Sequence, residues 1–213
     1  YRIPELGPID GQANILGMNK KLSIVSAQLI LGEKDNPVLK ATGYVNDLSA
    51  MQGVLIDAQL HLDGRRFAAF ADFHKLPELG ALTGQLSISD KDGTLGIESF
   101  QLETGKPELL SLKVDGRFDN FKDISTLILN SSLTARDLKL IGAIFDRNWR
   151  AIGPVQLNAE IRRTGKGSNL TSTLTAGKTE VQAKLNALFR ATPKLISGTV
   201  TARELFLWDL VEK

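Results

Sequence analysis

The sequence predicts a mostly β protein built from three tandem repeats, each with about four antiparallel strands and a short helix, joined into one curved and twisted sheet. The first observation behind this prediction is a fixed period, because Gly7, Gly80 and Gly153 follow one another at intervals of 73 residues. A fixed period is typical of repeat architectures. The second observation is that apolar and polar residues alternate after each glycine, as they do in a strand with one buried face.

The first predicted strand of each repeat follows from this alternation, in "IPELGPIDGQANI", "LPELGALTGQLSI" and the looser "RAIGPVQLNAEI". Four apolar or glycine positions recur in the three copies, separated each time by one polar residue. They are Ile9, Leu82 and Val155; Gly11, Gly84 and Leu157; Ala13, Leu86 and Ala159; and Ile15, Ile88 and Ile161. We therefore expect all of these residues to share one face of the sheet.

The second predicted strand contains a break in its pattern. Leu22 and Ile24 match Leu95 and Ile97, after which the apolar register slips by one residue in both copies. An odd spacing at the same place in two repeats predicts a β-bulge, in which one extra residue bends the strand.

The third and fourth predicted strands return to strict alternation. The third runs through Leu39 to Val45, Leu112 to Phe118 and Ala183 to Phe189, with Lys40, Lys113 and Lys184 pointing outward. The fourth carries Ile56 to Leu62, Leu129 to Ala135 and Ile196 to Ala202. On the apolar face, Gly11 matches Gly84 and Gly43 matches Gly116, and glycine within a strand marks a bend or a close approach.

Each fourth strand is followed by a segment that drops the alternation, at residues 65–76, 138–149 and 205–213. These segments are consistent with short amphipathic helices or with a turn or two of irregular chain. For Trp149 and Trp208, which fall in or beside them, we expect packing over the end of the sheet, with contact to lipid as the alternative. We treat residues 1–213 as a single repeat domain, with repeats at 1–75, 76–148 and 149–213, from a longer chain.

Composition excludes several classes of protein. The 213 residues are 42% hydrophobic but contain no run long enough for a transmembrane helix. There is no cysteine, and therefore no disulfide or thiolate metal site. The net charge is only +2, with both signs interleaved, so we expect no binding to nucleic acid.

The sequence also lacks the residue sets that catalysis requires. His61 and His74 have no partner at metal-ligand spacing, and no Ser/His/Asp set can be assembled. The stretch "RTGKGSN" at 163–169 lacks the first glycine of a phosphate-binding loop and is better explained as a hairpin turn. We expect a protein that is not an enzyme and has no cofactor, metal or catalytic residue.

Four stretches carry a resemblance to a known family: "LPELGALTGQLSI", "GTLGIESFQLETG", "LSLKVDGRFDN" and "SSLTARDLKLI". The stretch "VTARELFLWDL" at 200–210 repeats the last of these patterns, and the likeness covers essentially the whole chain. In order and recurrence they resemble the AsmA-like family, the AsmA/TamB-type bridge-like lipid transfer proteins. The resemblance implies a taco-like β-groove that carries phospholipids between inner and outer membrane in the periplasm. It also implies an anchor in the inner membrane and contacts to both membranes through parts of the parent protein outside this sequence.

Under this hypothesis, the apolar face is the lining of the lipid groove. We name ten residues for that role: Ile24, Leu29, Leu86, Ile97, Leu102, Val114, Phe118, Leu133, Leu185 and Val200. Alternation alone also fits a packed core, so a structural β-repeat scaffold that assists outer-membrane protein or envelope assembly remains the alternative. A third possibility is recognition of a polysaccharide, or of an outer-membrane β-barrel during its assembly through exposed strand edges.

Overall fold

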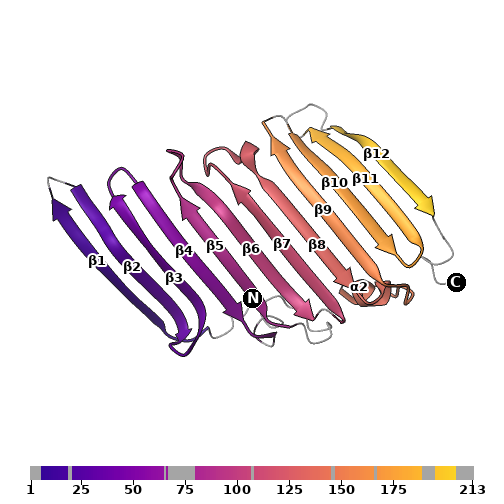
Figure 1. Ribbon diagram of the computed structural model, residues 1–213, viewed down its shortest axis with the longest axis horizontal. Helices are drawn as coiled ribbons and strands as arrows, with labels where there is room; N and C mark the ends of the chain where they lie inside the picture. The colour runs from indigo at the N-terminus through magenta and orange to yellow at the C-terminus, as the bar shows by residue number, and fades with distance from the viewer. Residues whose placement is uncertain are drawn as a thin grey trace.

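A computed structural model describes residues 6–18, 21–64, 66, 80–106, 108–144, 147–165, 167–188 and 195–204. They form one sheet of twelve strands whose spatial order is the chain order, each antiparallel to the next (Figure 1). The strands are β1 (Ile9–Met18), β2 (Lys21–Glu33), β3 (Asn36–Asp47), β4 (Gln52–Leu62), β5 (Leu82–Ser89), β6 (Gly96–Lys106), β7 (Leu110–Phe118), β8 (Ile128–Ala135), β9 (Val155–Thr164), β10 (Gly167–Ala176), β11 (Thr179–Leu188) and β12 (Leu195–Glu204). The predicted mostly β fold is confirmed.

Among the described residues, two short helical elements lie between strands. A 3₁₀ turn, η1 (Ile124–Thr126), lies between β7 and β8, and helix α2 (Leu138–Ile144) lies between β8 and β9. The predicted helix at 138–149 is therefore present but shorter than expected. Beyond Ile144, the Arg147 amide donates to the Gly142 carbonyl at 2.8 Å, a contact typical of the end of a helix. The segments at 65–76, except for Arg66, and at 205–213 lie outside the described residues.

The predicted β-bulge is present in both copies. In the β1–β2 pair, Asn14 lies opposite Ser26 and Ile15 opposite Ile24, which leaves Val25 as the extra residue. The β5–β6 pair has the same break, with Glu98 as the extra residue. Val25 and Glu98 are 73 residues apart, so the irregularity follows the period of the sequence.

The strand register is also the same at equivalent places. Gly43 lies opposite Ile56 in β3–β4, and Gly116 lies opposite Leu129 in β7–β8. At the next boundary, Ile56 lies opposite Ile88 in β4–β5, and Leu129 opposite Ile161 in β8–β9. The two boundaries between groups of four strands are therefore built in one register.

Glycine is required at two of these positions by a close approach of the neighbouring strand. A Cβ on Gly43 would lie 2.3 Å from the Leu55 carbonyl oxygen, and one on Gly116 would lie 2.3 Å from the Ile128 carbonyl oxygen. The Phe100 ring also lies over Gly116, 2.8 Å from the same hypothetical Cβ. These glycines let adjacent backbones and side chains approach where a larger residue would push them apart.

The buried side chains lie at the ends of the strands. Val38, Val45, Val54, Leu62, Leu110, Ala135, Val155 and Ala176 are all within the first or last three residues of their strands, and each is at most 8% exposed. The middle of the sheet contains no such residue among those described. The hydrophobic core therefore lies along the two rims of the sheet.

Candidate functional site

One face of the sheet is apolar across all twelve strands, and we call it the apolar face. Its members are directly opposed from strand to strand, so they point to the same side. One complete row crosses the sheet through Gly11, Leu29, Ala41, Ala58, Leu86, Phe100, Gly116, Leu129, Ile161, Leu170, Leu185 and Gly198. The alternation in the sequence thus becomes a continuous surface.

The register places all ten residues named from the sequence on the apolar face. Leu29, Leu86 and Leu185 belong to the row above, and Leu102, Val114 and Val200 to the next row. Leu102 lies directly opposite Val114, and Ile97 directly opposite Phe118. The ten residues are spread over β2, β5, β6, β7, β8, β11 and β12, so they form a long surface instead of one compact pocket.

Helix α2 covers one end of the apolar face. Leu138 of the helix packs with Leu110, Ala135, Val155 and Ala176, which are successive partners across β7, β8, β9 and β10. Around this cluster lie Leu133, Ile141, Trp149, Ile152 and Leu174. Trp149 therefore packs over the end of the sheet, as the sequence predicts, whereas Trp208 lies outside the described residues.

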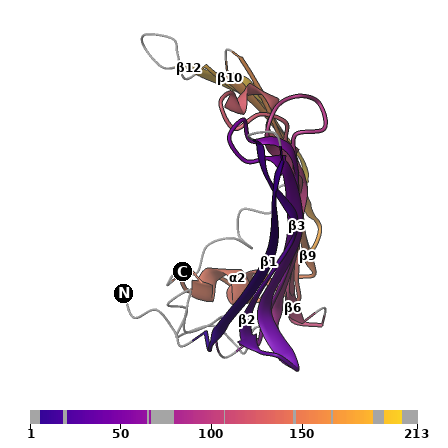
Figure 2. The same cartoon turned by 90° about the vertical axis from the view of Figure 1, so that its left-hand side faces the viewer.

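The sheet is bent, and α2 lies on its concave side (Figure 2). Because α2 packs on the apolar face, that face is the concave one. None of the ten named residues is buried: Leu29, Leu102 and Val200 are 41%, 38% and 64% exposed, and the other seven are half-buried. Of these seven, Leu133 packs against the cluster under α2. In a packed core of this size the same side chains would be almost fully buried.

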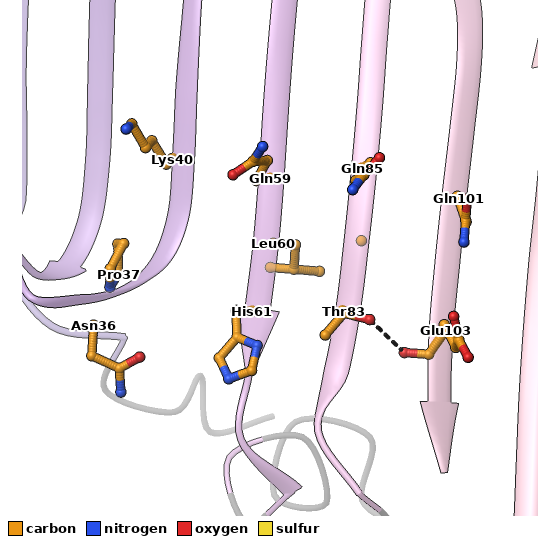
Figure 3. A pocket seen from close by; sticks show the side chains of 11 residues that line it. Asn36, Pro37, Lys40, Gln59, Leu60, His61, Thr83, Gln85, Gln101 and Glu103 are labelled. Carbon is orange, nitrogen blue, oxygen red and sulfur yellow. Dashed lines mark hydrogen bonds between the residues drawn. The ribbon is translucent and has the colours of Figure 1, made fainter. Parts of the chain in front are cut away.

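The opposite face is polar, and sequence reasoning did not single it out. A shallow hollow of about 440 Å³ lies there between β3 and β6 (Figure 3). Lys40, Gln59, Gln85 and Gln101 cross it as one row of directly opposed residues, beside the exposed His61. A signal was available, because Gln85 and Gln101 follow Gln12 and Gln28 at the 73-residue period.

Charges on the polar face are paired locally. Arg162 donates to the carboxylate of Glu160 on the same strand, which lowers the pKa of Glu160 and raises that of Arg162. Asn130 donates to Asp115 across β7 and β8 at 2.9 Å. These contacts are typical of a solvated strand surface.

Neither a metal centre nor a membrane-spanning helix is found in the part of the chain that the structure describes. No group of three or more His, Cys, Asp or Glu side chains is placed to hold an ion there. No described helix is long and apolar enough to cross a bilayer.

Comparison with known proteins finds no match for this chain. No family model matches it, and no curated protein or solved structure is significantly similar to it.

Proposed function

We propose that the apolar face is a lipid-binding groove, and that the chain is a non-enzymatic segment of a periplasmic protein that carries phospholipids between inner and outer membrane. The observation that carries this proposal is that the ten lining residues lie on one continuous concave face without being buried. Apolar surface of this extent is uncommon on soluble monomers and marks a site of interaction.

The chemistry of the lining suits acyl chains. Each CH₂ group moved from water to an apolar surface contributes about 0.8 kcal/mol. Exposing a 16-carbon acyl chain to water therefore costs on the order of 12 kcal/mol, which contacts with the lining must offset. Of the ten lining residues, nine are aliphatic and only Phe118 is aromatic. A mostly aliphatic surface stabilises an acyl chain at many positions along it, which allows the chain to slide.

We further propose that the sheet consists of three repeats, at 1–75, 76–148 and 149–213, that continue one taco-like groove. Support comes from the shared bulge at Val25 and Glu98 and from the equal register at the β4–β5 and β8–β9 boundaries. The β9–β10 pair has no register shift. The third copy therefore keeps the strands but not the bulge.

The resemblance of the chain to the AsmA-like family supports the same proposal. It adds the periplasmic location, the inner-membrane anchor and the two membranes as partners. The alternative is a structural repeat scaffold for envelope assembly, and the cluster under α2 favours it, because there the apolar face is a packed core. The two proposals differ in whether the open part of the face takes up lipid.

The test is Leu102→Asp, which places a carboxylate in the middle of the open face. Leu102 is 38% exposed, so the variant is expected to fold. An unpaired charge beside an acyl chain costs several kcal/mol, so binding of phosphatidylethanolamine with a fluorescent acyl chain should fall at least about tenfold. Phospholipid that copurifies with the protein, measured by mass spectrometry, should fall with it.

The matched control is Gln101→Asp, which adds the same charge one residue away on the polar face. Leu29→Asp repeats the test on β2, at a position that is 41% exposed. A wild type that binds no phospholipid, or a folded Leu102→Asp variant that binds as much as Gln101→Asp, would favour the scaffold.

A further inference from the structure

The polar face is hollowed along a line that crosses the strands. The hollow between β3 and β6 shares Lys40 with a second hollow of about 530 Å³ on β1 to β4, and it shares Gln85 and Gln101 with a third of about 660 Å³ on β5 to β9. The third hollow shares Asp115 and Asn130 with a fourth of about 320 Å³ on β7 to β10. We call this continuous series of hollows the polar track.

One row of directly opposed side chains runs along the polar track, on the strands from β3 to β8. In chain order the row consists of Lys40, Gln59, Gln85, Gln101, Asp115 and Asn130. Figure 3 shows its first four members side by side on adjacent strands. Asn130 donates to Asp115, whereas the first four members have no hydrogen bond or ion pair with any residue that the structure describes. Their amide and ammonium groups are therefore available to a ligand.

The amides of the polar track recur in the sequence, although no contact in the described part of the fold requires them. The pairs retained at the 73-residue period are Gln12 and Gln85, Gln28 and Gln101, and Lys40 and Lys113. The pairs that change on the same face are Val25 and Glu98, Tyr44 and Arg117, and His61 and Thr134. Substitution at exposed strand positions costs little stability, so retention of the glutamines and the lysine indicates a role other than packing.

The retained side chains suit the recognition of sugar hydroxyls. A carboxamide both donates and accepts hydrogen bonds, as a hydroxyl group does, so a row of carboxamides is complementary to a chain of sugars. Tyr44, which is 39% exposed, lines the same hollow as Lys40 and adds an aromatic ring. An aromatic ring of this kind offers an apolar surface for the C–H groups of a sugar and a hydroxyl for its polar groups.

The charges along the polar track nearly balance, which disfavours a charged polymer as the ligand. The cations that line the hollows are Lys40, Lys113, Arg117 and Arg162, and the carboxylates are Asp57, Glu98, Glu103, Asp115 and Glu160. A polyanion would require an excess of cations along its path, and a polycation an excess of carboxylates.

We propose that the polar track binds an uncharged linear glycan, laid across the strands on the face opposite the apolar one. At a strand spacing of about 4.8 Å, the distance across the sheet from β3 to β8 is about 24 Å. The strand spacing is comparable with the length of one sugar unit, so successive sugars meet successive strands. The proposal stands on the polar face and does not require that the apolar face bind lipid.

The first test is the length of glycan that the wild type prefers. Chitohexaose, an uncharged chain of six sugars, should bind at least about tenfold more tightly than chitobiose, because the disaccharide reaches fewer of the hydrogen-bonding side chains. Binding should also shift the side-chain amide NMR signals of Gln59, Gln85 and Gln101. The signals of Gln182, an exposed glutamine of β11 that lines none of the four hollows, should not move.

The second test removes two opposed amides. The double variant Gln85→Ala with Gln101→Ala should bind chitohexaose about tenfold more weakly than the wild type in calorimetric titration. Gln182→Ala is the matched control and should bind as the wild type does. Circular dichroism checks that both variants fold. Leu102→Asp, which tests the lipid proposal, should leave chitohexaose binding unchanged, because its side chain lies on the opposite face.

Three outcomes would overturn the proposal: no binding of chitohexaose up to millimolar concentration, equal affinity of the double variant and Gln182→Ala, or displacement of chitohexaose by dextran sulfate. The second outcome would place the sugar elsewhere on the chain, and the third would assign the polar track to a polyanion. None of these outcomes depends on lipid.

Discussion

At the scale of single residues, Asp47 closes the end of β3. Its Oδ1 accepts hydrogen bonds from the Ser49 hydroxyl at 2.7 Å and from the Ala50 amide at 3.1 Å, and its Oδ2 lies 3.3 Å from the Lys21 amine. These contacts favour the ionised form, the Ser49 hydrogen bond most, and lower the pKa of Asp47 to about 2.

We therefore predict a specific loss of stability in acid. The pKa of Asp47 is lower in the folded chain than the value of about 3.9 in an unfolded one, so its contribution is present above about pH 4. It is lost as the pH falls from there to about 2. Ser49→Ala should raise the pKa of Asp47, which carboxyl NMR titration measures. A wild-type Asp47 that titrates near 3.9 would contradict the prediction.

Gly116 gives a second prediction at this scale. Gly116→Ala should lower the free energy of unfolding by about 1–3 kcal/mol, because the new Cβ would meet the Ile128 carbonyl and the Phe100 ring. Gly11→Ala is the control in the same row, since its Cβ would lie 3.6 Å from Leu29, an ordinary contact. Denaturant unfolding of both variants measures the difference; equal stability would show that the strands adjust to the added methyl group.

At the scale of elements, the strands could be predicted because their alternation sets both their span and their faces. Even the bulge at Val25 was readable, since one extra residue breaks a period of two in a visible way. The length of α2 could not be predicted from the sequence. The hydrogen bond from the Arg147 amide to the Gly142 carbonyl at its end depends on how this segment packs against the sheet. Nor did alternation show that Leu29 or Val200 would remain accessible, because exposure depends on what covers a face.

The four strands under α2 should be the most protected part of the sheet. Backbone amides of β8 and β9 near Ala135 and Val155 are expected to exchange with deuterium more slowly than those of β2 and β3, because α2 packs on the ends of β8 and β9. Trp149→Ala should speed exchange there and leave β2 unchanged. Faster exchange in β8 than in β2 of the wild type would contradict this assignment of the core.

At the scale of the whole molecule, the distinctive feature is a single bent layer whose buried side chains lie at the rims. The sequence could not predict which face would be concave, because an alternating pattern is compatible with either curvature. The position of α2 decides it, by packing on the apolar face at one rim. This arrangement leaves the middle of the face open, and the lipid proposal depends on that opening.

The strand order β1 to β12 has a consequence for folding as well. Each strand pairs only with its neighbours in sequence, so no contact in the sheet must wait for distant parts of the chain to meet. The free energy of unfolding is then close to a sum of contributions from single strands and from pairs of neighbouring strands, as in linear repeat proteins. Folding of the sheet can therefore nucleate at any hairpin and extend in both directions. Unfolding should begin by fraying at β1 and β12 and advance one strand at a time toward the strands that α2 holds.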